Sequence, residues 1–447
     1  DIYIKKSMEI IEKYGLPRNN VPDFYKDAEE QLKNFLHINW VSLPFFQNQY
    51  RQIYGEIEQL LGGIKNIRIF KQLDELSGRK CSICGERNAL LYKGNPDRFH
   101  KNAFPLKGNI SINLTEGEGL CSICFVKRSY ESKKQERFPS TAKIALMDTL
   151  NKLDETGETL VNEYKGEFHF LFDEFDEQLF YEENITKKYF RKNYIPEKSI
   201  EVIAKKQKDL GKYIKHNGLK LCKYYAIVML DGDNMGKWLS GENLCNYNKE
   251  DINLYEFHKE MSSRLIQYGN EMKNIFIEPS GKLVYAGGDD LLGFINLNHL
   301  PTVLKNIREK FPDFEEIKID NKKIIKDGIP STASCGVVIA HYKTPLSDVL
   351  NWVRRMEKEE AKKVDGKNSC AIAVLKHSGE IVKTIFKWKY CSDNKTTWTT
   401  DLMDNLIKML SRDIISSNFI TTLNREFLPL MEQDGSYKEG IIVEKEL

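Results

Sequence analysis

Between residues 223 and 377 the apolar positions form short continuous runs separated by amphipathic stripes. The run from Tyr224 to Leu230 is apolar throughout, which is typical of a strand buried on both faces. Further along, the pattern predicts a helix over 251–275, strands over 282–287 and 290–296, a helix over 301–311, a strand over 332–340, a helix over 346–363 and a strand over 369–376. The predicted fold class is α+β, with a ferredoxin-like β-α-β-β-α-β order extended by one helix and one strand.

Outside this unit helical periodicity predominates, as in residues 24–37 and 50–61. The aromatic stretch INWVSLPFF between these helices is predicted to be a buried strand or a docking loop, with Trp40 in a core. We predict five regions: a helical region over 1–80 as a candidate remnant of a first palm-like domain, a zinc-binding module over 81–130, a helical linker domain over 131–222, a palm domain over 223–380 and a helical region over 381–447.

Four aspartates follow two of the predicted strand ends. Asp231 and Asp233 come after the buried run, and Asp289 and Asp290 lie beside two glycines, which are a hairpin signal. Carboxylates gathered at one edge of a sheet repel one another unless cations lie among them. Mg²⁺ prefers such oxygen ligands and usually shares its shell with phosphates. The pattern therefore predicts a two-metal site for phosphoryl or nucleotidyl transfer. The alternative is that these are ordinary turn residues.

Two repeated tetrapeptides, Cys81-Ser-Ile-Cys84 and Cys121-Ser-Ile-Cys124, form the second motif. Each Cys-x-x-Cys turn presents two thiolates to one ion, and two such turns complete a tetrahedral zinc shell. Because all four predicted ligands are cysteine, the site is expected to be structural rather than catalytic. A redox role of either pair is the alternative.

Charge and composition restrict the class of protein. The 67 basic residues nearly balance the 65 acidic ones, so nucleic-acid binding must be local. There is no run of eighteen apolar residues and no signal peptide, so no membrane contact is expected. Nine cysteines with scattered singles favour a reducing cytoplasm. The chain begins at Asp1 rather than Met, and we therefore expect it to be part of a longer protein.

Several segments together resemble the large, polymerase-like subunit of type III CRISPR effector complexes, in its III-B (Cmr) form. They are RFPSTAKIAL at 137–146, VMLDGDNMGKWL at 228–239, YAGGDDLL at 285–292, SCGVVIAHYKTPL at 334–346, EKEEAKK at 357–363 and GKNSCAIAVLKHSGE at 366–380. The paired Cys-x-x-Cys motifs fit that subunit as well. The GGDD segment alone also occurs in diguanylate cyclases, whereas its combination with the paired cysteines and the other segments is much more specific to this subunit. The resemblance covers about residues 24–40 and 80–380.

The resemblance implies a palm that binds ATP with Mg²⁺ or Mn²⁺ and makes cyclic oligoadenylate when the complex captures target RNA. The implied catalytic and metal-binding residues are Asp231, Asp289 and Asp290. The residues assigned to the nucleotide are Gly232, Asp233, Asn234, Met235, Gly236, Lys237, Gly287, Gly288, Ser334, Lys358 and Lys362. Lys358 and Lys362 lie at the end of the predicted helix over 346–363. The alternative to a nucleotide contact is that these two lysines belong to a solvent-exposed helix face. The implied partners are other Cmr subunits, especially one with an RNA-recognition-like fold, the guide crRNA and the target RNA.

Three functions stay open at this point. The first is a metal-dependent nucleotidyltransferase or cyclase within a ribonucleoprotein. The second is a scaffold whose palm binds nucleotide without turnover. The third is a free-standing diguanylate-type cyclase, against which the zinc motif and helical regions argue. The N-terminal HD nuclease motif that many such subunits carry is missing from this sequence, so DNA cleavage by that route is not expected here.

Overall fold

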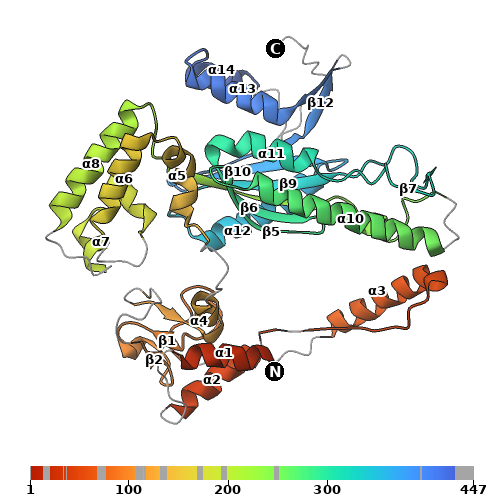
Figure 1. The fold of residues 1–447 in the computed structure, drawn as a ribbon, viewed down its shortest axis with the longest axis horizontal. Helices are drawn as coiled ribbons and strands as arrows, with labels where there is room; N and C mark the ends of the chain where they lie inside the picture. The colour runs from red at the N-terminus through yellow and green to blue at the C-terminus, as the bar shows by residue number, and fades with distance from the viewer. Residues whose placement is uncertain are drawn as a thin grey trace. The chain divides into compact units, whose positions relative to one another are not determined.

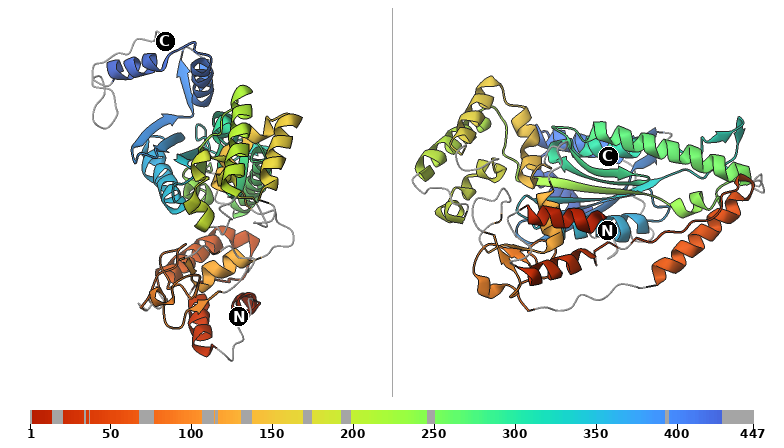
Figure 2. Two further views of the ribbon diagram at one scale, coloured as in Figure 1. Left: turned by 90° about the vertical axis from the view of Figure 1, so that its left-hand side faces the viewer. Right: turned by 60° about the horizontal axis from the view of Figure 1, so that its bottom comes forward.

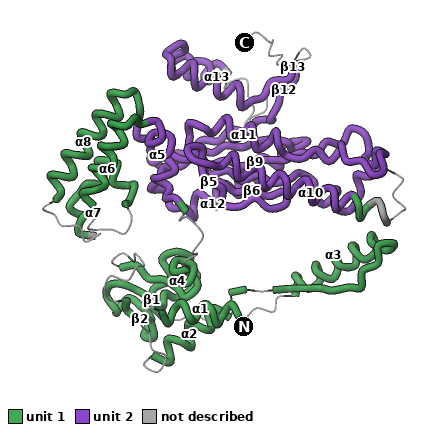
Figure 3. Tube along the Cα trace, in the orientation of Figure 1, with its two compact units in different colours: residues 1–138, 153–219, 246–256 green, residues 139–152, 220–245, 257–447 purple. Residues whose placement is uncertain are grey.

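The structure is a computed structural model that describes residues 2–13, 21–33, 35–36, 38–67, 77–106, 114, 117–130, 138–168, 175–192, 199–245, 251–392 and 395–427. The chain forms two compact units (Figure 3). One comprises residues 1–138, 153–219 and 246–256, and the other comprises residues 139–152, 220–245 and 257–447.

The second unit is built on a central sheet, which Figure 1 shows with helices packed around it. This sheet has six strands in the order β11-β10-β9-β4-β6-β5. Its strands are β4 (Tyr224–Gly232), β5 (Gly281–Gly287), β6 (Asp290–Asn296), β9 (Ala333–His341), β10 (Ser369–Leu375) and β11 (Ile381–Lys387). Strand β4 is antiparallel to both β6 and β9, and β10 runs parallel to β9. The order β9-β4-β6-β5 is the ferredoxin-like arrangement of a β-α-β-β-α-β unit, so the predicted fold class is confirmed.

Helices cover both faces of this sheet. Long helix α10 (Asp251–Ile275), which Figure 2 (right) shows running along the strands, packs with α11 (Leu300–Glu309) on one face. The other face is covered by α5 (Thr141–Asn151) and α12 (Leu346–Arg355). The β4 side chains alternate accordingly, with Ala226 and Val228 toward the first pair and Ile227 toward the second. Burial on both faces explains why β4 is apolar from Tyr224 to Leu230.

The predicted helix over 346–363 is interrupted. Helix α12 ends at Arg355, a π-helical turn follows over Met356–Glu360, and a 3₁₀ turn covers Ala361–Lys363. A Cβ atom on Gly336 of β9 would lie 2.5 Å from the Glu357 nitrogen and 2.5 Å from the Val353 oxygen. The wide turn therefore lies directly on the strand, and only a glycine there permits this approach.

Helix α5 belongs to the same compact unit as the sheet, although it precedes β4 by more than seventy residues of chain. The hydroxyl oxygen of Ser140 caps its start by accepting a hydrogen bond from the Lys143 amide at 3.1 Å. The Asn296 side chain at the end of β6 donates to the carbonyl oxygens of Ile144 and Ala145, at 2.9 and 3.0 Å.

Smaller elements complete the second unit. They are α9 (Met235–Leu239), a 3₁₀ turn η7 (Leu297–His299), hairpins β7 (Lys318–Ile319) with β8 (Lys322–Lys323) and β12 (Lys389–Ser392) with β13 (Lys395–Trp398), and helices α13 (Thr399–Ser411) and α14 (Ser417–Phe427). The Lys305 ammonium pairs with the Asp401 carboxylate at 2.9 Å, which ties α13 to α11.

The first unit is mainly helical. Its helices are α1 (Ile2–Glu12), α2 (Pro22–Lys33), α3 (Tyr50–Asn66), α4 (Ser122–Ser129), α6 (Glu155–Gly166), α7 (Lys187–Lys192) and α8 (Ile200–His216). A small sheet holds β1 (Leu91–Tyr92), β2 (Phe104–Pro105) and β3 (Gly119–Leu120), and 3₁₀ turns lie at Gln47–Gln49, Pro96–Arg98, Glu177–Phe180 and Glu182–Asn184. Helices α1, α2 and α4 share one core that includes Phe24, Leu32 and Phe125.

One prediction for this unit is wrong. The stretch over 38–46 has no regular structure, and the side chain of Trp40 is 77% exposed rather than in a core. An apolar run by itself does not distinguish a buried strand from an exposed segment. The docking-loop alternative stays a prediction. None of the helices in the described part of the chain has the length and apolar character needed to cross a membrane.

Candidate metal and nucleotide site

Three carboxylates meet at one end of the sheet in the second unit. Asp231 lies next to the last residue of β4, Asp289 lies in the turn between β5 and β6, and Asp290 begins β6. One carboxylate oxygen from each lies within 4.8 Å of the other two. Oxygen ligands around one Mg²⁺ are about 3–4 Å apart, so a small movement of these side chains suffices to share a cation. The structure thus brings together the three residues that the sequence indicated as catalytic.

A glycine permits this convergence. A Cβ atom on Gly232 would lie 2.9 Å from the Asp289 Cβ and 2.8 Å from the Met235 Cγ. The hairpin turn can therefore approach the end of β4 only because residue 232 has no side chain. The turn lies one residue later than a Gly-Gly turn would, because Gly287 pairs with Asp290 and the central residues are Gly288 and Asp289. Gly288 has φ of +64°, as the first central position of a type II′ turn requires.

The electrostatics of the cluster favour a bound cation. Burial raises the pKa of Asp289, and the neighbouring Asp290 charge raises it further. Burial also raises the pKa of Asp290, while the Lys358 ammonium lowers it. Carboxylates whose charged forms are disfavoured in this way gain stability from a divalent ion among them. The donor set therefore fits Mg²⁺ or Mn²⁺.

A lysine and a buried glutamate adjoin the cluster. The Lys362 ammonium pairs with Asp231 Oδ2 and lies 3.0 Å from Glu357 Oε1. Burial lowers the pKa of Lys362 to about 8 and raises the pKa of Glu357 to about 7. The sequence analysis assigned Lys362 to the nucleotide and missed Glu357. Within EKEEAKK no sequence signal distinguishes Glu357 from Glu359 and Glu360, because only the π-helical turn directs Glu357 inward.

Asp233 takes a different position from its neighbours. Its side chain is 2% exposed, and Oδ2 accepts hydrogen bonds from the Thr332 hydroxyl at 2.8 Å, the Ser334 hydroxyl at 3.1 Å and the Asn368 amide at 3.0 Å. Arg308 in turn donates to the Asn368 side chain at 2.9 Å. Asp233 therefore fastens the turn after β4 to the start of β9 and to the segment before β10. Ser334, assigned from the sequence to the nucleotide, is fully buried in this network.

The other residues assigned to the nucleotide lie on the loop and short helix after β4, in the β5–β6 hairpin and in the π-helical turn. Asn234 adopts a left-handed conformation with φ of 55° and accepts a hydrogen bond from Lys367 at 2.7 Å. Lys237 is exposed, and its ammonium lies 3.5 Å from the Glu242 carboxylate. A Cβ atom would meet open space at Gly236 and Gly287. Met235 is half-buried against Gly232, and Lys358 is exposed. Their roles at a nucleotide stay predictions.

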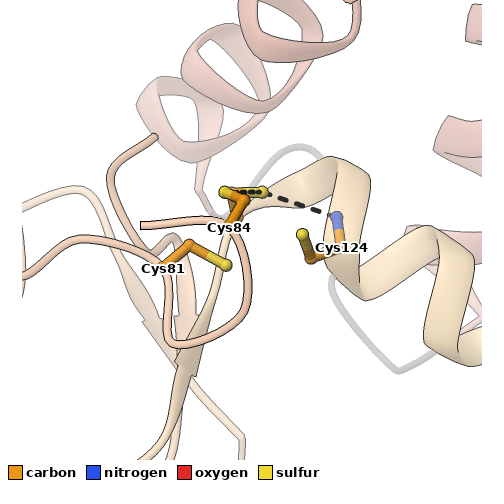
Figure 4. A group of neighbouring side chains, drawn as sticks. Cys81, Cys84 and Cys124 are labelled. Carbon is orange, nitrogen blue, oxygen red and sulfur yellow. Dashed lines mark hydrogen bonds between the residues drawn. The ribbon is translucent and has the colours of Figure 1, made fainter. Parts of the chain in front are cut away.

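The four cysteines form a separate cluster in the first unit. Cys81 and Cys84 lie on a loop before β1, and Cys121 caps α4, which carries Cys124 (Figure 4). All four sulfurs lie within 4.8 Å of one another, and the Cys84 and Cys121 sulfurs are 3.9 Å apart. A tetrahedral zinc site has sulfurs about 3.8 Å apart, given Zn–S bonds of about 2.3 Å. The amide of Ser122 donates to Gln31 of α2 at 2.9 Å, which anchors the second pair. The donor set therefore fits one zinc ion.

Comparisons with known proteins agree with this geometry. Residues 224–371 match the family model of the second palm domain of Cas10/Cmr2. The palm sheet of the second unit is therefore similar to the second palm domain of Cas10/Cmr2. The curated CRISPR system Cmr subunit Cmr2 of Pyrococcus furiosus is 28% identical to this chain over 432 residues, which cover 87% of this chain and 44% of that protein. The resemblance to the large subunit of type III-B complexes is confirmed.

Solved structures show the same fold. The type III-B Cmr-beta complex in its apo state contains a chain that matches 98% of this one with a TM-score of 0.55 at 16% identity, over 64% of its own length. The Cmr-beta complex bound to cognate target RNA matches 89% of this chain with a TM-score of 0.52, also at 16% identity, over 58% of its own length. The chain spans about half the length of the curated relative that it matches.

Proposed function

We propose that this chain is the palm-bearing part of the large subunit of an RNA-guided type III-B CRISPR complex, and that its palm joins adenylates from ATP into cyclic oligoadenylate. The observation that carries the proposal is the convergence of Asp231, Asp289 and Asp290 at the end of β4 and the β5–β6 hairpin. Three carboxylates on rigid strand ends are a typical arrangement for nucleotidyl transfer.

The reaction is attack of a ribose hydroxyl on the α-phosphate of a second ATP, with pyrophosphate leaving. Divalent cations, when bound, activate the hydroxyl and stabilise the charge that develops on the phosphate oxygens. Asp231, Asp289 and Asp290 would hold these cations. The backbone amides from Gly232 to Gly236 would approach the phosphates, because Gly236 leaves open space on this loop. Lys358 and Lys362 would supply positive charge to the triphosphate.

The second part of the proposal concerns the cysteine cluster. Cys81, Cys84, Cys121 and Cys124 would hold one zinc ion that stabilises the fold of their module. The module has only short strands of two residues each, so a metal ion would supply stability that its small sheet lacks.

The partners follow from the relatives. The related chains belong to Cmr complexes, one of which is bound to cognate target RNA. We therefore propose that this chain assembles with other Cmr subunits, among them one with an RNA-recognition-like fold, and meets guide and target RNA through that assembly. This function would be carried out in the cytoplasm.

Calorimetric titration of the chain with ATP and with GTP, each with Mn²⁺, tests the site. We expect Mn²⁺-dependent binding of ATP that is lost in the Asp289→Ala/Asp290→Ala variant, whose folding is checked by circular dichroism. A preference for GTP would favour a diguanylate-type cyclase instead. Binding of ATP without formation of any oligoadenylate in the assembled, RNA-bound complex would favour the scaffold function. Full turnover in the double variant would contradict the assignment of the acids.

A further inference from the structure

The Lys362 ammonium lies between two carboxylates of different kinds. Asp231 belongs to the acidic cluster and is half-buried, whereas Glu357 is only 2% exposed. Within the described part of the chain, Glu357 Oε1 is buried and makes no hydrogen bond, although the Lys362 nitrogen is only 3.0 Å away. The glutamate therefore has unused capacity to accept a hydrogen bond from this ammonium.

The fold brings Glu357 to this place by specific means. The π-helical turn over Met356–Glu360 interrupts α12 where it meets β9, and Gly336 leaves the space that the Glu357 backbone and Cβ occupy. A Cβ atom on Gly336 would lie 2.9 Å from the Glu357 Cβ. A regular helix with a longer residue at position 336 would not bring this carboxylate so close to the strand. π-helical turns of this kind occur frequently at functional sites.

We propose that Lys362 is a built-in counter-ion that occupies the Asp231 carboxylate in the metal-free protein, and that Glu357 is a positioning residue that receives the ammonium when a divalent cation takes Asp231. The inference rests on the proposed function only in that the acidic cluster binds a divalent cation. It does not depend on the identity of the nucleotide or of the product.

The physical argument is a competition between two cations for one carboxylate. When a metal ion displaces the half-buried Lys362 ammonium from Asp231, the ammonium loses that partner. This is unfavourable unless a second acceptor lies within its reach. Glu357 is such an acceptor, and the four-carbon stem of lysine allows the short movement. The released ammonium stays beside the cluster, where it can meet the phosphates that accompany the metal.

Titration of the chain with Mn²⁺ alone, followed by electron paramagnetic resonance of the free ion, tests the proposal without nucleotide or turnover. We expect Lys362→Met to bind Mn²⁺ about tenfold more tightly, because the competing ammonium is absent. Glu357→Gln should bind it about tenfold more weakly, because the ammonium then has no second anionic partner. Lys363→Met removes the same charge from the exposed neighbouring position and should leave the affinity unchanged.

The double variant Lys362→Met/Glu357→Gln separates positioning from direct ligation. If Glu357 acts only through Lys362, the double variant binds Mn²⁺ as tightly as Lys362→Met alone. A further loss in the double variant would show that Glu357 is itself a metal ligand and would overturn the proposal. Unchanged or weaker binding by Lys362→Met, or no Mn²⁺ binding by any variant, would overturn it as well.

The same titrations distinguish this inference from the proposed function. The expected order of Mn²⁺ affinities without any binding of ATP would support the counter-ion and contradict the nucleotide proposal. Binding of ATP with equal Mn²⁺ affinities in all variants would support the nucleotide proposal and contradict the counter-ion. Circular dichroism and zinc content of each variant confirm that the chain is folded.

Discussion

The substitution Gly232→Ala adds one methyl group at the point where the hairpin turn meets β4. That carbon would lie 2.9 Å from the Asp289 Cβ and 2.8 Å from the Met235 Cγ. Non-bonded carbon atoms normally stay about 3.5–4.0 Å apart, so the turn must retreat by roughly 0.6–1 Å. Met235 can rotate away, but Asp289 is fixed by the pairing of Gly287 with Asp290. The strain therefore falls on the turn that carries two of the three carboxylates.

Two measurable consequences follow from this displacement. Overpacking of this size destabilises a fold by about 1–3 kcal/mol. Binding sites tolerate displacements of only about 0.5 Å, so Mn²⁺ affinity should fall about 10–100-fold. The assay is calorimetric titration with Mn²⁺, combined with urea unfolding followed by circular dichroism on the same preparation. The loss of affinity should exceed what the fraction of unfolded chain explains.

Gly211→Ala is the matched control. Gly211 lies within α8 of the other unit, and a Cβ atom there would meet nothing within 4 Å. This substitution should raise helix stability by up to about 1 kcal/mol and leave Mn²⁺ binding unchanged. Wild-type affinity and stability in Gly232→Ala would refute the close approach of β4 and the hairpin, and with it the argument that this glycine is required.

Three further predictions concern the surroundings of the site and the cysteine module. Asp233→Ala should lower the free energy of unfolding by about 3 kcal/mol or more, because one buried and two half-buried donors lose their acceptor. Urea unfolding of this variant beside the milder Thr332→Ala measures the effect. Equal effects of the two substitutions would contradict the network. Cys121→Ser should reduce bound zinc from one ion per chain to less than half, measured by mass spectrometry of the metal, whereas Cys391→Ser at an exposed position should not. Burial raises the pKa of Glu357 to about 7, so between about pH 4.5 and pH 7 the folded chain holds a proton that the unfolded chain has lost. Without added divalent cation, the free energy of unfolding should therefore fall as the pH rises through this range. Glu357→Gln should flatten this dependence, and an identical slope in the variant would contradict the shift.

Much of the palm was predictable because its signals are local. Strand β4 is buried on both faces, so its apolar run could be read directly, and the predicted helix over 251–275 coincides with α10. The predicted strands 282–287 and 290–296 nearly coincide with β5 and β6. The three acids were found for the same reason, since each lies at a strand end or in a turn marked by glycine.

The exposure of Trp40 could not be predicted from local sequence signals. Its apolar neighbours predicted a buried segment, and the side chain is exposed because no described strand or helix covers it. Whether an apolar run is covered depends on the elements around it, and these are distant in the chain. The regular helix predicted over 346–363 fails on similar grounds, because the contact with Gly336 twenty residues earlier decides where α12 gives way to the π-helical turn.

The sequence by itself predicted the succession of helices and strands along the palm and the two clusters of candidate ligands, because residue type and short spacing express each of them. Only the tertiary structure decided which side chains from distant parts of the chain lie around the three carboxylates and which point away from them. Asp233 lies two residues after Asp231, yet it points into a buried network, while Glu357, more than a hundred residues later, lies beside Lys362. Both outcomes depend on strand register and on the approach of backbone segments at Gly232 and Gly336. Such long-range contacts have no signature in a short stretch of chain.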